Sequence, residues 1–219
     1  MESPSATRRG NENADAIYWS VGKSLSTWEA NEVTLAKMFG LFVESESQAA
    51  EWAYGIFSGN SGKKDALKYA AEIFSSRRNE KFSMHDFNLL LSHYQGGVAR
   101  RNEIAHGIVQ LIKIDNEERG YFLTPPLYNS RKGVAHTPSF WEKVRDQSSQ
   151  DPFAVFGHCY RYTSQDIEHF TNLFAELQRQ AASFFIEQLM IVGKEKFNRI
   201  PDSQKVTIQL GESNGPVAQ

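Results

Sequence analysis

Apolar side chains recur at the helical period along most of this 219-residue chain. Such a stripe indicates a helix that buries one face in a core, because residues three and four apart lie on the same side of a helix. The stripes cover residues 15–42, 47–57, 63–76, 83–112 and 163–192. The first predicts one long helix, or two in succession with a bend near Asn31. Together they predict a mainly all-α fold, an up-and-down bundle of about five helices with Trp19, Trp28 and Trp52 in its core.

Two of the stripes begin with a pattern that is typical of helix N-termini. Ser83 precedes Asp86 by three residues, and Thr163 precedes Asp166 in the same way. In such a capping box the hydroxyl oxygen accepts a hydrogen bond from an early helix amide, and the acidic side chain reaches back to the cap. We therefore expect helices to begin at Ser83 and Thr163, and the second of them to end near Gly193.

A short strand is predicted after Asp115, where the helical pattern gives way to turn residues. The segment 121–124, Tyr-Phe-Leu-Thr, is rich in β-forming residues, and two prolines stop it. We expect a partner strand within residues 155–162. The helical bundle should thus carry a small two-stranded β excursion.

The two ends of the chain differ in composition from the middle. Residues 1–14 are mostly polar, and residues 193–219 finish in a run rich in Gly and polar side chains. Segments with few apolar side chains bury too little surface to offset the entropy lost on ordering. We therefore expect a helical domain over residues 15–192, a disordered N-terminal tail and a largely disordered C-terminal extension.

Charge and cysteine content narrow the functional classes. With 24 basic and 26 acidic residues the formal net charge is −2, which argues against a protein that coats nucleic acid by bulk electrostatics. The single cysteine, Cys159, excludes an internal disulfide, and with scattered histidines it offers no ligand set for a structural zinc. We expect no metal, no cofactor, and a reducing, cytoplasmic setting. There is neither an apolar leader nor an 18-residue apolar run, so we also expect no membrane contact.

The candidate functional residues lie near the end of the fourth stripe, in the segment Arg-Arg-Asn-Glu-Ile-Ala-His-Gly. Arg101, Asn102 and His106 place a guanidinium, an amide and an imidazole within two turns of one predicted helix. Two other Arg-to-His pairs have a similar spacing, namely Arg78 with His85 and Arg131 with His136. Only the pair at 101 and 106 combines that spacing with an asparagine and a long amphipathic helix.

This motif resembles the hallmark of the HEPN family of helical-bundle proteins. There an arginine, followed by a polar residue that is often asparagine, precedes a histidine by four to six positions on a late helix. The resemblance covers residues 15–192 in helix order and lengths, and its specific part is Arg101, Asn102 and His106. It implies a homodimer that brings two motif helices together and, in catalytic members, a metal-independent endoribonuclease. A regulatory partner protein is a separate expectation. Ile108 replaces the tyrosine of toxin members that a nucleotidyltransferase modifies, which puts that regulation in doubt.

The chemistry of RNA cleavage suits these residue types. It needs a base for the 2′-hydroxyl proton, a cation for the scissile phosphate and an acid for the leaving oxygen. His106 suits the base or the acid, since an imidazole exchanges a proton near neutral pH. Arg101 offers a planar fork of donors for phosphate oxygens, and Asn102 would orient the imidazole or bind substrate. One chain supplies one such histidine, so both roles call for a dimer.

Four further residues are candidates for holding single-stranded RNA. They are Arg100, Tyr128, Arg131 and Lys132. The last three combine an aromatic ring with two cations after the predicted strand, which would extend a nucleic-acid groove. An ordinary exposed loop has the same composition, so that alternative stays open.

A structural role for the motif is the main alternative to catalysis. Arg101 lies in the middle of an apolar stripe, where an arginine is often the buried partner of a carboxylate. Glu29 and Glu32 of the first predicted helix are the obvious partners. On that interpretation Arg101 ties two helices together, His106 bonds to the backbone, and the chain is a non-catalytic dimeric interaction module.

Overall fold

The computed structural model describes residues 9–57, 59–78, 82–114, 117–126 and 160–199. This part of the chain contains five helices and one two-stranded sheet, so the expected mainly α fold is confirmed. The helices are α1 (Ala14–Phe42), α2 (Ala49–Ile56), α3 (Gly59–Ser76), α4 (Met84–His106) and α7 (Ser164–Arg199). The strands are β1 (Ile108–Ile114) and β2 (Glu117–Thr124).

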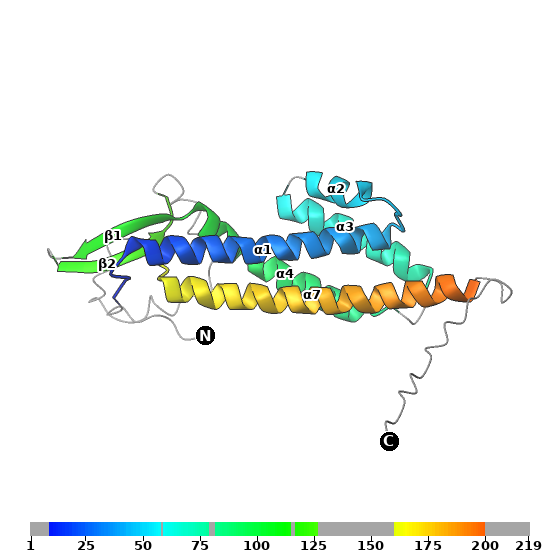
Figure 1. Ribbon diagram of the computed structural model, residues 1–219. Helices are drawn as coiled ribbons and strands as arrows, with labels where there is room; N and C mark the ends of the chain where they lie inside the picture. The colour runs from blue at the N-terminus through cyan, green and yellow to red at the C-terminus, as the bar shows by residue number, and fades with distance from the viewer. Residues whose placement is uncertain (1–8, 58, 79–81, 115–116, 127–159, 200–219) are drawn as a thin grey trace, which may run out of the picture.

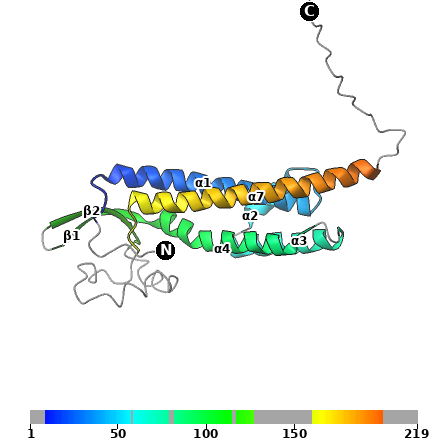
Figure 2. The same ribbon diagram turned by 90° about the horizontal axis from the view of Figure 1, so that it is seen from below.

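The bundle is long and narrow, with α1 and α7 side by side along its length (Figures 1 and 2). These two helices run in the same direction. Lys23 meets Glu168 near their N-termini, and farther along the Asn31 amide donates to the carbonyl of Phe174. Helices α2 and α3 lie along one half of the bundle only, and the β-hairpin lies at the other end (Figure 1).

Aromatic rings fill the centre of the bundle. Trp28 of α1 stacks on Tyr94 of α4 with 5.2 Å between ring centroids, and its ring meets Phe174 of α7 edge-on at 4.9 Å. Farther along, a second cluster joins the same helices to α3; it consists of Phe42, Phe74, Phe82, Phe87 and Phe184. Each buried ring of this size stabilises the fold by roughly 1.5–3 kcal/mol relative to an exposed one. This core fixes α1, α4 and α7 relative to one another.

Only one of the three tryptophans predicted in the core is there. Trp28 is buried, whereas Trp19 and Trp52 are exposed, so their predicted core positions are wrong. Trp19 is nine residues from Trp28, which places it half a turn round α1 and away from the core. In α2 it is Tyr54 that faces inward.

The end of α4 differs from the sequence prediction. The stripe predicted as helix to residue 112 is helical only to His106, and residues 108–114 form β1, which pairs antiparallel with β2. Gly107 has an extended backbone, and a Cβ there would lie 2.6 Å from Cγ of Leu123. Glycine thus lets the chain leave the helix against the hairpin, and the β-branched residues that follow favour a strand.

The strand predicted at 121–124 is part of β2, but its main partner, β1, was not predicted. Tyr162, at the end of the predicted partner segment, makes a single antiparallel bridge to Leu123. Residues 155–159 lie outside the described part of the chain. A run such as Ile-Val-Gln-Leu-Ile-Lys-Ile satisfies both a helical and a strand pattern, which is why the sequence misled here.

Both predicted caps are present, and among the described residues the capping box is complete at Thr163, whereas at Ser83 the serine half is formed. The Ser83 hydroxyl accepts from the amide of Asp86 at 3.2 Å. Thr163 and Asp166 bond reciprocally, with 2.8 Å between the Thr163 amide and the Asp166 carboxylate. These contacts fix where α4 and α7 begin.

Several boundaries differ from the predicted ones. Helix α1 is unbroken through Asn31, whose buried amide bonds to α7. Helix α3 begins at Gly59, one turn before the predicted stripe at residues 63–76. Helix α7 continues through Gly193 to Arg199. Within the predicted N-terminal tail, Asn11 exchanges two backbone hydrogen bonds with Tyr121 of β2.

Candidate functional site

The predicted motif occupies the last two turns of α4. Arg101 and Asn102 are half-buried, and His106, the last helical residue, is exposed. The Ser83 cap at one end and Gly107 at the other fix the span of the helix. The motif therefore lies at the junction between the bundle and the hairpin, on a rigid helix.

Arg101 lies at the contact between α1 and α4. Its Nη2 atom is 3.7 Å from Oε1 of Glu29, and its Nη1 atom donates to Oδ1 of Asn102 at 3.2 Å. Its Nε atom is buried and has no hydrogen-bond partner among the described residues. The side chain is 31% exposed, so the guanidinium is held loosely and is still open to an anion.

Of the two glutamates predicted as partners of Arg101, Glu29 is the one in contact. Glu32 is engaged elsewhere, because it accepts a hydrogen bond from the Tyr94 hydroxyl at 2.8 Å and one from Nζ of Lys63 at 2.7 Å. Burial, with the charge of Glu32 added, raises the pKa of Tyr94 far above its ordinary value. The Tyr94 hydroxyl therefore stays protonated and donates to Glu32.

Arg100 has a different environment from its neighbour. Its Nη1 atom donates to the Tyr162 hydroxyl at 2.6 Å and lies 2.9 Å from Oε2 of Glu103. Tyr162 in turn donates to that same Glu103 oxygen at 2.6 Å. Arg100 is 19% exposed, so the residue predicted to bind substrate is tied into a closed network. The other predicted substrate-binding residues, Tyr128, Arg131 and Lys132, lie outside the described residues.

Burial governs the titration of this network. It raises the pKa of Glu103, and the charge of Arg100 and the hydrogen bond from Tyr162 act in the opposite direction. Burial also raises the pKa of Tyr162 well above its ordinary range. The phenol therefore stays protonated and keeps its place as the bridge between Arg100 and Glu103. The pattern Arg-x-x-Glu on a helix predicts such an ion pair, whereas no sequence pattern links it to Tyr162, which is 62 residues from Arg100.

Helix α3 covers the contact between α1 and α4 over only part of its length. The first turns of α3 bond to the middle of both helices, with Lys63 on Glu32 and Lys64 on Gln95. Toward the hairpin, α1 and α4 continue beyond α3 (Figure 1). We call this stretch the open seam; it contains the contact of Glu29 with Arg101 and its neighbour Asn102. Helical spacing places Tyr18 and Gly22 on the side of α1 that holds Glu29, and Ala105 on the side of α4 that holds Arg101.

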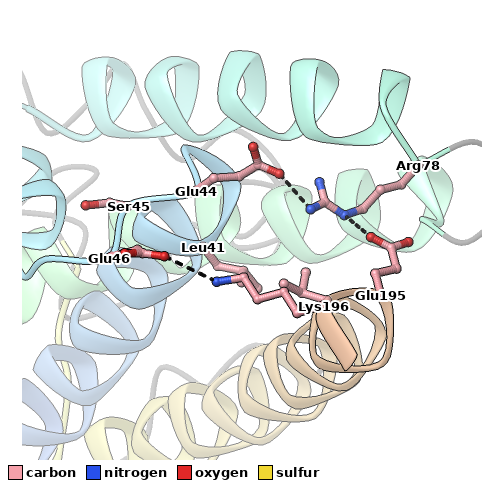
Figure 3. Close-up of a pocket in the computed structure, with 8 residues that line it drawn as sticks. Leu41, Glu44, Ser45, Glu46, Arg78, Glu195 and Lys196 are labelled. Atoms are coloured by element: carbon pink, nitrogen blue, oxygen red, sulfur yellow. Dashed lines mark hydrogen bonds and ion pairs between the residues drawn. The ribbon is translucent and has the colours of Figure 1, made fainter. Parts of the chain in front are cut away.

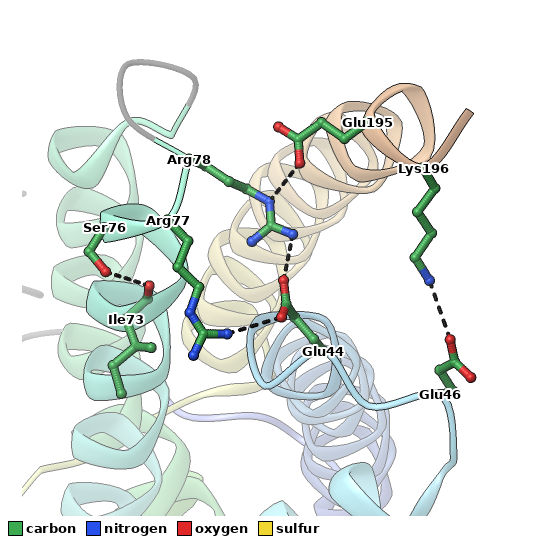
Figure 4. A network of polar contacts seen from close by, with 8 residues as sticks. All are labelled: Glu44, Glu46, Ile73, Ser76, Arg77, Arg78, Glu195 and Lys196. Carbon is green, nitrogen blue, oxygen red and sulfur yellow. Dashed lines mark hydrogen bonds and ion pairs between the residues drawn. The ribbon is translucent and has the colours of Figure 1, made fainter. Parts of the chain in front are cut away.

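A cavity of about 260 Å³ lies at the opposite end of the bundle (Figure 3). Charged groups around it pair with one another. Arg78 lies 2.6 Å from Glu44 and 3.2 Å from Glu195, and Lys196 lies 3.6 Å from Glu46 (Figure 4). The hydrogen bond from Arg78 lowers the pKa of Glu44. These contacts join the ends of α1, α3 and α7, which is a structural role.

These ion pairs also bear on Arg78 and His85, one of the two other Arg-to-His pairs with a spacing similar to that of Arg101 and His106. The Arg78 guanidinium lies over the ring of Phe74, 3.8 Å from its centroid, and is nine-tenths buried. The Arg78 guanidinium is therefore not available to bind a substrate together with His85. The cavity at this end is not lined by Arg101, Asn102 or His106. Residues 131 and 136 lie outside the described part of the chain.

Comparison of the chain with protein-family models, with curated proteins and with solved structures gave no match. Its class is given by its fold, a mainly α bundle that carries one antiparallel hairpin. In the part of the chain that the structure describes, no helix has both the length and the apolar character needed to cross a membrane. The same residues include no cluster of three His, Cys, Asp or Glu side chains that would hold a metal ion.

Proposed function

We propose that this protein is a metal-independent endoribonuclease that cleaves single-stranded RNA as a homodimer. The observation that carries the proposal is the placement of Arg101 and His106 in the last two turns of α4, with Arg101 at the open seam. There a half-exposed guanidinium and an exposed imidazole lie one turn and a half apart. The resemblance of this motif to the HEPN hallmark points to the same chemistry.

The reaction uses one cation and two proton carriers. A neutral His106 takes the 2′-hydroxyl proton, and the 2′-oxygen attacks the phosphorus. The bond from phosphorus to the 5′-oxygen breaks, and a protonated imidazole gives that oxygen its proton. The products are a 2′,3′-cyclic phosphate and a 5′-hydroxyl. Arg101 holds the charge that develops on the phosphate oxygens.

A second copy of the chain supplies the second proton carrier. Asn102 and Ala105 lie half-buried on the flank of α4 at the open seam, and a small residue such as alanine permits close approach of another helix. Two copies that meet on this flank would bring two His106 side chains to one groove. One would then act as base and the other as acid.

The experiment uses the full chain, labelled single-stranded RNA and a chelator of divalent metal ions. We expect the wild type to release fragments that end in a 2′,3′-cyclic phosphate, and His106→Ala to release none. His85→Ala is the matched control, because His85 is exposed in the first turn of the same helix. Circular dichroism checks that all three proteins fold alike. Equal inactivity of wild type and His106→Ala would refute the nuclease.

The contact between Arg101 and Glu29 favours one alternative, a non-catalytic dimeric interaction module. In that case Arg101 joins α1 to α4 and has no substrate. Analytical ultracentrifugation distinguishes the two functions when combined with the cleavage assay. A stable dimer that cleaves no RNA, and that Asn102→Arg or Ala105→Arg dissociates, would support the module.

A further inference from the structure

Tyr18 is an exposed aromatic residue in the second turn of α1, and it is 58% accessible. Among the described residues its side chain has neither a hydrogen-bond partner nor a ring partner. A tyrosine in such a position keeps one face of its ring free. Neither the fold nor the proposed proton transfers use it.

The helix geometry places Tyr18 on the same side of α1 as Glu29, the residue that contacts Arg101. Eleven residues separate the two, which is three turns and returns the side chain to the same face. Trp19, its neighbour, is turned by about 100° to the outer surface. Tyr18 therefore belongs to the open seam, and Trp19 does not.

The antiparallel course of α1 and α4 also brings Tyr18 level with His106. Phe42 packs on Phe87, whereas Gly97 packs against Trp28, so the start of α1 lies beside the end of α4. From Trp28 to Tyr18 is ten residues, about 15 Å along α1, and from Gly97 to His106 is nine residues, about 14 Å along α4. The free ring of Tyr18 and the imidazole of His106 thus lie at about the same height along the bundle.

We propose that Tyr18 is a base-stacking residue that receives an unpaired base of the RNA next to the cleaved phosphate. This inference rests on the proposed function, and it explains why the substrate would be single-stranded. Every base has a π-face, so stacking on a tyrosine ring holds a nucleotide without reading its sequence. Bases within a duplex already stack on their neighbours and do not reach the ring. The site thus selects RNA by its lack of pairing.

The test measures binding without cleavage, by fluorescence anisotropy of a labelled single-stranded RNA on the His106→Ala protein. Adding Tyr18→Ala should weaken binding about five- to a hundred-fold, which is the range for loss of one stacked base. Tyr18→Phe, which keeps the ring, should bind as the parent does, and Tyr18→Leu, which keeps only apolar bulk, should bind weakly. Tyr69→Ala on α3 is the matched control, since Tyr69 is 65% exposed but lies beyond the open seam.

Four results would be informative. Loss of binding with Tyr18→Ala and Tyr18→Leu, but not with Tyr18→Phe or Tyr69→Ala, supports stacking, whether or not the wild type cleaves RNA. Equal binding by Tyr18→Ala and Tyr69→Ala overturns it and leaves the nuclease intact. Equal affinity of the parent for a duplex of the same sequence also overturns it. Absence of RNA binding by every variant and by the wild type overturns both the inference and the proposed function.

Discussion

Arg101 and Glu29 meet across the contact between α1 and α4, with 3.7 Å between Nη2 and Oε1. The separation is long for an ion pair, and Glu29 is mostly exposed, so water and salt screen the interaction. A pair of this kind contributes at most about 1 kcal/mol to stability. A phosphate could therefore displace Glu29 from Arg101 with little cost to the fold.

Removing the charge of Glu29 should strengthen the binding of RNA. In Glu29→Gln the guanidinium keeps its position but loses its competing anion, so we expect RNA affinity to rise about two- to five-fold at low salt and the gain to shrink as salt increases. The control is Glu168→Gln, which removes an equally exposed glutamate that pairs with Lys23. An equal gain in both variants would mean that net charge, not the contact with Arg101, is responsible.

The two adjacent arginines should differ in their effect on stability. Arg100→Ala leaves Glu103 and Tyr162 buried without their cation, and should lower the free energy of unfolding by about 2–4 kcal/mol. Arg101→Ala should cost less than about 1 kcal/mol, because its partner is exposed. Urea denaturation of both variants measures the difference. Equal losses would contradict the distinction drawn between a structural Arg100 and an available Arg101.

The long elements of the fold could be predicted from the sequence because their stripes and caps are local signals. Thr163 with Asp166 fixes the start of α7, and both lie within one turn. The first strand of the hairpin could not be predicted, since residues 108–114 satisfy two periods and their pairing with β2 decides between them. A local pattern contains no information on such a distant neighbour.

In the candidate site, too, local patterns predicted some features, whereas others depend on residues that are distant in the sequence. The apolar stripe predicted Arg101 on a late helix with Glu29 or Glu32 as its partner, and the structure has Glu29 in contact. The environment of Arg100 could not be predicted, because it depends on Tyr162, which is distant in the sequence and contacts Arg100 only in the folded chain. The exposure of Tyr18 likewise depends on what the fold places beside it.

Two adjacent glycines in α4 should respond oppositely to alanine. A Cβ at Gly97 would lie 2.8 Å from Cζ3 of the buried Trp28, so Gly97→Ala should destabilise the protein by about 1–3 kcal/mol. A Cβ at Gly96 meets nothing within 4 Å, so Gly96→Ala should stabilise it by about 0.5–1 kcal/mol through better helix propensity. Thermal denaturation compares them. Stabilisation by both would show that α1 and α4 are not packed as closely as described.

The ion pairs at the far end of the bundle should make stability depend on acid. The hydrogen bond from Arg78 lowers the pKa of Glu44 from its ordinary value of 4.5, so the folded chain holds this carboxylate ionised more strongly than the unfolded chain does. The resulting stabilisation is complete above about pH 4.5 and is lost as pH falls through the lowered pKa. Glu44→Gln should therefore be less stable than the wild type at pH 7, and the gap should close in acid.

Glu46→Gln is the control for that prediction, because Glu46 belongs to the same connection between α1 and α2 but is almost fully exposed and lies 3.6 Å from Lys196. Its urea midpoint should follow that of the wild type at every pH, since an exposed pair at that distance contributes little. Urea midpoints measured from pH 3 to pH 7 give the comparison. A gap between Glu44→Gln and the wild type that stays constant with pH would mean that Glu44 acts through packing, and that its charge does not hold α1 to α3.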